Sequence, residues 1–142
     1  MYIADGKTNG PAFSWPDGKR IAVMVTFDYD AEFLRISRAK SKGTSIGFTD
    51  FSRGQYGPHE GLARCLDMLD TMNIKSTFFV PGAVIETYRD TVEEIHRRGH
   101  ELACHGYRHE SDPELSRDEM IKILDKSEAL LAEITGKKPV GH

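Results

Sequence analysis

The feature that most constrains the fold is an alternation of short apolar segments with longer amphipathic ones. The first apolar segment reads Arg-Ile-Ala-Val-Met-Val-Thr-Phe, which is typical of a strand covered on both faces. Strands are predicted over 20–27, 75–80, 100–105 and, as the start of a fourth, 137–142, with helices over 59–72, 87–98 and 116–136. A helix that follows each strand returns the chain to the same end of the sheet, so the strands should be parallel. We therefore predict an α/β fold with a parallel sheet.

Composition narrows the class of protein further. The 142 residues are 39% hydrophobic and 29% charged, as in a soluble globular protein of one domain spanning residues 1–142. A net charge of −3 provides no basic stripe, so we expect no nucleic-acid partner. Every apolar run is shorter than the roughly 18 residues of a membrane helix, so we expect no membrane partner.

The N-terminus and the cysteines bear on the cellular compartment. The opening residues Met-Tyr-Ile-Ala-Asp-Gly-Lys lack the basic and apolar regions of a signal peptide. The two cysteines, Cys65 and Cys104, are too few for a disulfide framework. We therefore expect a cytoplasmic protein with reduced thiols.

Two groups of polar side chains follow predicted strands. Asp28 and Asp30 come at the end of the first strand, and His105 and His109 come at the end of the third. Alone, an acidic pair is more often a turn former or a helix cap, and a histidine pair often lies on a surface. Gly106 favours a loop that could turn both imidazoles toward one point. Because parallel strands end at one edge of a sheet, the two groups are expected to meet there.

Such a meeting would form a mixed nitrogen and oxygen site. Two imidazoles and one carboxylate suit Zn²⁺ and related divalent metals, and three protein ligands leave positions open for water and substrate. The second carboxylate could then take a proton from the attacking water. Cys104 should face away from His105 along the strand, as a buried apolar side chain, with a ligand role as the lesser alternative. The other interpretation is surface histidines without a metal.

Four segments resemble the polysaccharide deacetylase family, also called the NodB-homology or carbohydrate esterase 4 group. Thr-Phe-Asp-Tyr-Asp at 26–30 is similar to the family's first motif, Thr-Phe-Asp-Asp-Gly, and His-Gly-Tyr-Arg-His at 105–109 matches its His-x-x-x-His motif. Lys-Ser-Thr-Phe-Phe-Val-Pro-Gly at 75–82 and Gly-His-Glu at 99–101 also resemble the family. The similarity extends from about residue 19 to the end of the chain.

The resemblance implies a function and a role for each matched residue. Asp28 would be the general base, and Asp30, His105 and His109 would bind the metal, with zinc expected and cobalt or iron as alternatives. Water would attack an amide carbonyl, and a tetrahedral oxyanion would form. The implied fold is a distorted parallel (β/α) barrel of about seven strands, with only its N-terminal half present. A metal-dependent deacetylase or amidohydrolase is therefore expected.

The sequence departs from the family pattern after Asp30. Ala31 replaces the usual glycine and begins a segment, 31–58, that has no sustained period and is predicted to be a long loop insertion. It would be either a solvated excursion or a cover over a substrate pocket. With residues 52–58, it resembles a subgroup of candidate peptidoglycan deacetylases, allantoinase-like proteins and cyclic imide hydrolases. The substrate would be an N-acetylated sugar or a small amide or imide.

A second departure concerns later family motifs. An Arg followed by Pro, which would pair with Asp28, and a later His acting as an acid do not occur in the chain. We therefore expect a domain truncated at its C-terminus, a partial gene product, or a chain completed by another copy as a homo-oligomer. The alternative function is a non-catalytic metal-binding module, or a fragment that needs the missing half.

Overall fold

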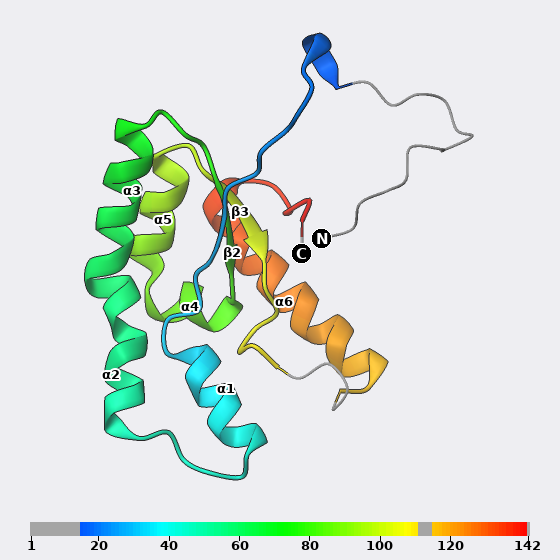
Figure 1. The fold of residues 1–142 in the computed structure, drawn as a ribbon. Helices are drawn as coiled ribbons and strands as arrows, with labels where there is room; N and C mark the ends of the chain where they lie inside the picture. Colours follow the sequence, from blue (N-terminus) through cyan, green and yellow to red (C-terminus); the bar gives the residue numbers. More distant parts are fainter. Residues whose placement is uncertain (1–14, 111–114, 142) are drawn as a thin grey trace, which may run out of the picture.

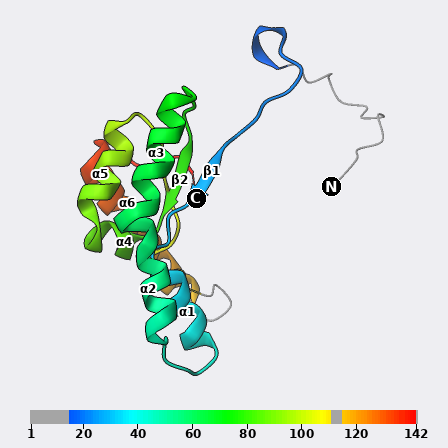
Figure 2. The same cartoon turned by 60° about the vertical axis from the view of Figure 1, so that its left-hand side comes forward.

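The computed structural model describes residues 15–110 and 115–141. Its centre is a sheet of three parallel strands in the order β1-β2-β3, namely β1 (Thr26–Asp28), β2 (Thr77–Val80) and β3 (Glu101–Cys104) (Figure 1). Three helices lie on one side of the strands: α3 (Leu62–Thr71), α5 (Arg89–Arg97) and α6 (Arg117–Thr135) (Figure 2). The predicted α/β class with a parallel sheet is confirmed.

The strands are shorter than predicted, and the first shows why. β2 begins at Thr77, which pairs with Thr26, so no described strand lies beside residues 20–24. Ile21, Val23 and Met24 are consequently 77%, 82% and 88% exposed. Of the predicted strand 20–27, only residues 26 and 27 lie in β1; the rest of the prediction is wrong, because residues 20–24 have neither a strand partner nor a covering layer among the described residues.

The predicted fourth strand is not formed as a strand, although one of its contacts is present. Residues 137–141 have no assigned strand, and His142 lies outside the described residues. The Cys104 N–H nevertheless donates a hydrogen bond to the Gly141 carbonyl over 3.0 Å. The chain therefore returns to the outer edge of β3, on the side away from β2.

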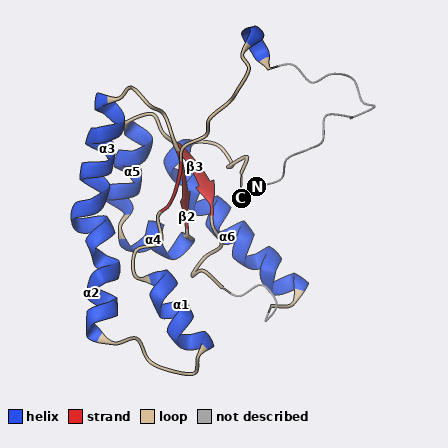
Figure 3. Ribbon diagram, in the orientation of Figure 1, coloured by secondary structure: helices blue, strands red, loops and turns tan. Residues whose placement is uncertain are grey.

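The segment 31–58 is helical, which corrects the predicted long loop. It contains α1 (Phe33–Ser41) and α2 (Phe48–Tyr56), and α2 continues through a π-helical turn, η2 (Gly57–Gly61), into α3 (Figure 3). Neither α1 nor α2 has a side-chain N-cap, and each has only nine residues. Helices this short depend on tertiary contacts rather than on local sequence. Because neither begins with the capping residue that usually marks a helix start, the sequence pattern did not predict them.

The remaining helices follow the predictions with one break. The predicted helix over 87–98 corresponds to α5, and α4 (Gly82–Thr87) before it lies outside the predictions; Tyr88, whose φ of −127° and ψ of 42° are not helical, separates the two. The last helix is confirmed, because Ser116 and Glu119 form the expected capping box and Gly136 ends the helix at φ +74°. None of the helices in the described ranges combines the length and the hydropathy that a bilayer span requires.

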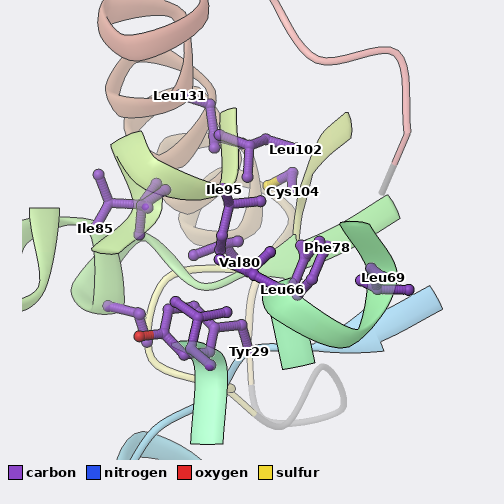
Figure 4. Close-up of a cluster of buried hydrophobic side chains, with 13 residues drawn as sticks. Tyr29, Leu66, Leu69, Phe78, Val80, Ile85, Ile95, Leu102, Cys104 and Leu131 are labelled. Carbon is purple, nitrogen blue, oxygen red and sulfur yellow. The ribbon is translucent and has the colours of Figure 1, made fainter. Parts of the chain in front are cut away.

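The core lies between the sheet and this helical layer. Phe78 and Val80 of β2 and Leu102 and Cys104 of β3 point into it, where they meet Leu131 of α6 (Figure 4). Cys104 is 2% exposed, as predicted for a small buried apolar side chain, and both cysteines are free thiols. The polar groups Asp30 and His105 lie outside this core, just after the carboxyl ends of β1 and β3.

Substitution of Gly54 tests how tightly α2 packs on the segment after β1. A Cβ at Gly54 would lie 2.5 Å from Glu32 Cα, whereas a Cβ at Gly57, on the same continuous helical stretch, would meet only a Tyr29 ring atom at 3.9 Å. Alanine in a helix normally stabilises by roughly 0.5–1 kcal/mol, but overpacking against backbone costs about 1–3 kcal/mol. We expect Gly54→Ala to lower the free energy of unfolding in urea and Gly57→Ala not to lower it. Equal effects would contradict the close packing.

The buried His100 predicts a sensitivity to acid. Its side chain is 3% exposed and its Nδ1 accepts a 3.2 Å hydrogen bond from the Ser76 N–H, so the ring is neutral. Burial, followed by the charge of Lys75, lowers the pKa of His100 below its ordinary value of 6.5. Below about pH 6.5 the unfolded chain therefore binds a proton that the folded chain does not, and stability falls as the pH falls.

The variant His100→Asn separates this effect from other titrations, because an asparagine oxygen can still accept the Ser76 N–H. We expect the free energy of unfolding to fall less in His100→Asn than in the wild type between about pH 7.5 and pH 5.5. Parallel pH profiles, measured by urea unfolding, would rule out His100 as the acid-sensitive group.

Candidate metal centre

The parallel register places Asp30 and His105 level with each other along the strand direction. Asp28 is level with Phe79, and Phe79 is level with Ala103. Two residues further along, Asp30 and His105 leave the carboxyl ends of β1 and β3, on either side of the end of β2. The tertiary structure therefore brings together two positions that are 75 residues apart in the sequence (105 − 30).

Asp30, His105 and His109 form a compact cluster. One ligand atom from each side chain lies within 4.8 Å of the other two. His105 Nε2 is 3.5 Å from Asp30 Oδ1, and the two imidazole centroids are 5.0 Å apart with ring planes at 87°. Ligand atoms that share a tetrahedral cation at about 2.1 Å are ~3.4 Å from one another. The spacing of the Asp30 and His105 atoms thus suits a shared divalent cation.

Two atoms of the cluster are buried and unpaired. Among the described residues, neither Asp30 Oδ1 nor His105 Nε2 has a hydrogen-bond partner. A buried polar atom without a partner costs roughly 1–3 kcal/mol, so an adjacent pair of them calls for a physical explanation. A cation between them would satisfy both atoms, and the donor set fits zinc.

The electrostatics of Asp30 reflect this burial. Burial raises the pKa of Asp30, and the charge of Asp28 adds to the rise. The nearby imidazoles of His105 and His109 and the guanidinium of Arg38 act in the opposite direction, but burial prevails. A positive charge at the cluster would favour the ionised carboxylate.

Asp28 lies beside the cluster rather than in it. It is the last residue of β1 and is exposed, and its charge acts on Asp30. Of the four predicted site residues, the structure therefore gathers three around one point and leaves Asp28 next to them, with no recorded partner among the described residues. This is the placement expected of a carboxylate that is not a ligand.

The loop between the two histidines is held by the neighbouring helices. The Gly106 carbonyl accepts hydrogen bonds from Ser127 Oγ of α6 over 2.8 Å and from the Gly82 N–H over 3.0 Å. The Tyr107 carbonyl accepts a 2.8 Å bond from the Ala83 N–H, at the start of α4. A Cβ on Gly82 would lie 2.6 Å from the Tyr107 ring, so the close approach requires glycine there.

The sequence alone did not predict these supporting residues, although one signal was available. Ser127 is 0% exposed and stands between Leu124 and Leu131 at helical spacing, so it is a polar residue within an apolar stripe. Glu110 gave no comparable signal. Its carboxylate accepts hydrogen bonds from the backbone N–H groups of Tyr107 and Arg108 at 2.9–3.1 Å, which closes the loop from within.

Backbone strain accompanies two residues of the site. Ala31, directly after Asp30, has φ +50°, and His109 has φ +60°. A non-glycine residue in this left-handed region costs on the order of 1–3 kcal/mol. Glycine would adopt either conformation without this cost. The strain persists because the surrounding hydrogen bonds and packing hold both segments.

Comparisons with known proteins agree with this arrangement. Residues 16–142 match the sequence profile of the polysaccharide deacetylase family. The chain is 34% identical over 124 residues to a peptidoglycan deacetylase of Helicobacter pylori, covering 87% of this chain and 41% of that protein. It is also 34% identical over 125 residues to a peptidoglycan deacetylase-like protein of Gibberella zeae, covering 87% and 36% respectively.

Solved structures show the same relationship. A candidate polysaccharide deacetylase from Mycobacterium smegmatis superposes with a TM-score of 0.79 at 39% identity, covering 94% of this chain and 46% of that one. An allantoinase superposes with a TM-score of 0.80 at 21% identity, covering 94% and 49%, a likeness that shows the fold alone. The chain thus spans less than half the length of each of these proteins. It belongs to the polysaccharide deacetylase family.

Proposed function

We propose that this chain carries the metal-binding part of a hydrolase that cleaves the amide carbon–nitrogen bond of N-acetylated amino sugars. The observation that carries the proposal is that Asp30 Oδ1 and His105 Nε2 lie buried 3.5 Å apart and have no hydrogen-bond partner among the described residues. The relationship to a peptidoglycan deacetylase at 34% identity supports the substrate class. Activity belongs to the protein in which these residues are completed by the rest of the domain.

The residues divide the work between binding and proton transfer. Asp30, His105 and His109 would hold the cation, with zinc expected from two imidazoles and a carboxylate, and cobalt or iron as alternatives. A bound divalent cation polarises the substrate carbonyl and makes water a stronger acid. Asp28, which is exposed beside the cluster, would accept the proton of the attacking water.

Two alternatives remain distinct from this proposal. A small cyclic amide or imide would use the same groups, because the bond to be cleaved has the same chemistry. A non-catalytic metal-binding module would keep the cation site and show no turnover. These are separated by assaying the full-length protein, with zinc added, on N-acetylated glucosamine oligomers, allantoin and a cyclic imide. Turnover of the oligomers supports the proposal, turnover of allantoin or the imide supports the second function, and bound zinc without turnover supports the third.

Zinc binding tests the site itself. Zinc at about 100 times its Kd should stabilise the folded chain by roughly 2.7 kcal/mol, which raises Tm by several degrees. We expect this rise in the wild type and its loss in Asp30→Ala, His105→Ala and His109→Ala. His96→Ala is the matched control, because His96 is exposed on α5 and away from the cluster. A rise of the same size in His105→Ala would contradict the site.

Substitution of Asp28 tests the division of roles. In the full-length protein, Asp28→Asn should reduce kcat by about 100- to 10,000-fold, the usual contribution of a general base. Zinc content, measured by elemental analysis, should stay at the wild-type level because Asp28 is not a ligand. Wild-type turnover in this variant would refute the assignment, as would loss of the metal.

A further inference from the structure

The backbone of His109 has one hydrogen bond that ties it to a distant helix. Ser37 Oγ, in the middle of α1, donates to the His109 carbonyl over 2.5 Å. Among the described residues, this is the only hydrogen bond between α1 and the loop that carries the two histidines. The other bonds to this loop end on Gly106, Tyr107 and Arg108. Among the described residues, α1 is thus the helix that bonds to the His109 backbone, while the Glu110 carboxylate closes the loop from within.

The same helix, α1, is also bonded to the backbone of Asp30, the carboxylate of the cluster. α1 begins directly after Asp30, and the Phe33 N–H donates to the Asp30 carbonyl over 3.0 Å. Phe33 packs against the core, and Ser37 follows four residues later on the same face of the helix. α1 therefore spans from the backbone of Asp30 to the backbone of His109.

Packing around the Ser37 bond is open. Ser37 lines two cavities of about 290 Å³ each, one with Arg108 and Leu115 and the other with Arg38 and His109. The Ser37 bond is half-buried at the border of these two hollows. A water molecule could satisfy the His109 carbonyl but would not attach it to α1.

We propose that Ser37 is a positioning residue for the metal centre, and that α1 sets the separation of Asp30 and His109. This inference rests on the proposed metal site. His109 adopts φ +60°, a conformation that the free loop would readily leave. The Ser37 bond stabilises it and so holds the second imidazole where the first already points.

Zinc affinity, measured by competition with a chromophoric chelator, tests the role of Ser37. A net hydrogen bond corresponds to roughly a 2- to 10-fold change in an equilibrium constant, so we expect Ser37→Ala to weaken zinc binding by about that factor. Ser37→Thr keeps the hydroxyl and should recover most of the affinity. Because the hydrogen bond is present in the metal-free chain, its loss should also lower Tm by a few degrees. Zinc affinity is therefore measured well below Tm, where every variant is folded, which separates positioning from general stability.

Ser41→Ala is the matched control. Ser41 lies one turn further along α1, and its hydroxyl donates only to the Ser37 carbonyl over 3.1 Å. We expect it to bind zinc as the wild type does. Zinc binding of wild-type strength in Ser37→Ala, or equal weakening in Ser41→Ala, would overturn the role of Ser37. Failure of the wild type to bind zinc would instead contradict the metal site.

A second measurement needs no metal. In the metal-free chain, the NMR resonance of the His109 carbonyl carbon reports on the hydrogen bond that it accepts. We expect an upfield shift of this resonance in Ser37→Ala and none in Ser41→Ala. An unchanged resonance in Ser37→Ala would show that the bond is absent in solution and would overturn the proposal.

Discussion

The parallel pairing of three short strands is the constraint on which the site depends. β1 and β3 are separated by one strand, so their backbones are about 9–10 Å apart. The side chains of Asp30 and His105, which leave the strands at the same height, span that separation and approach to 3.5 Å. A shift of one residue in either ladder would move one of these side chains to the opposite face of the sheet.

The local structure of the site raises the free energy of the folded state, and contacts with neighbouring groups compensate for this cost. Two buried atoms without partners and two non-glycine residues at positive φ each oppose folding by on the order of 1–3 kcal/mol. The compensating contacts come from the first amides of α4, from Ser127 in α6 and from Glu110 within the loop. These contacts hold the loop that carries His105 and His109 against α4 and α6.

Residues 31–58, which follow β1, form a packed helical segment rather than a simple turn. Glu32, at its start, is 5% exposed and accepts hydrogen bonds from the Tyr88 hydroxyl at 2.9–3.0 Å, while Gly54 of α2 packs against its backbone. The segment is therefore part of the packed structure and not a loose cover. α1 in this segment contacts the backbone of both Asp30 and His109. The part of the chain that departs from the family motif therefore contacts two of the three residues of the cluster.

The sequence by itself determined the order of elements, the parallel sheet, the last helix with its caps and the four polar residues at the strand ends. These depend on local patterns, namely apolar runs, capping residues and motif spacing, which a sequence displays directly. Only the tertiary structure decided that β1 begins as late as Thr26 and that residues 31–58 are helical, because both depend on neighbours distant in the chain. It also decided that Ser37 and Ser127 support the histidine loop, because a hydroxyl has no periodic pattern that identifies its partner.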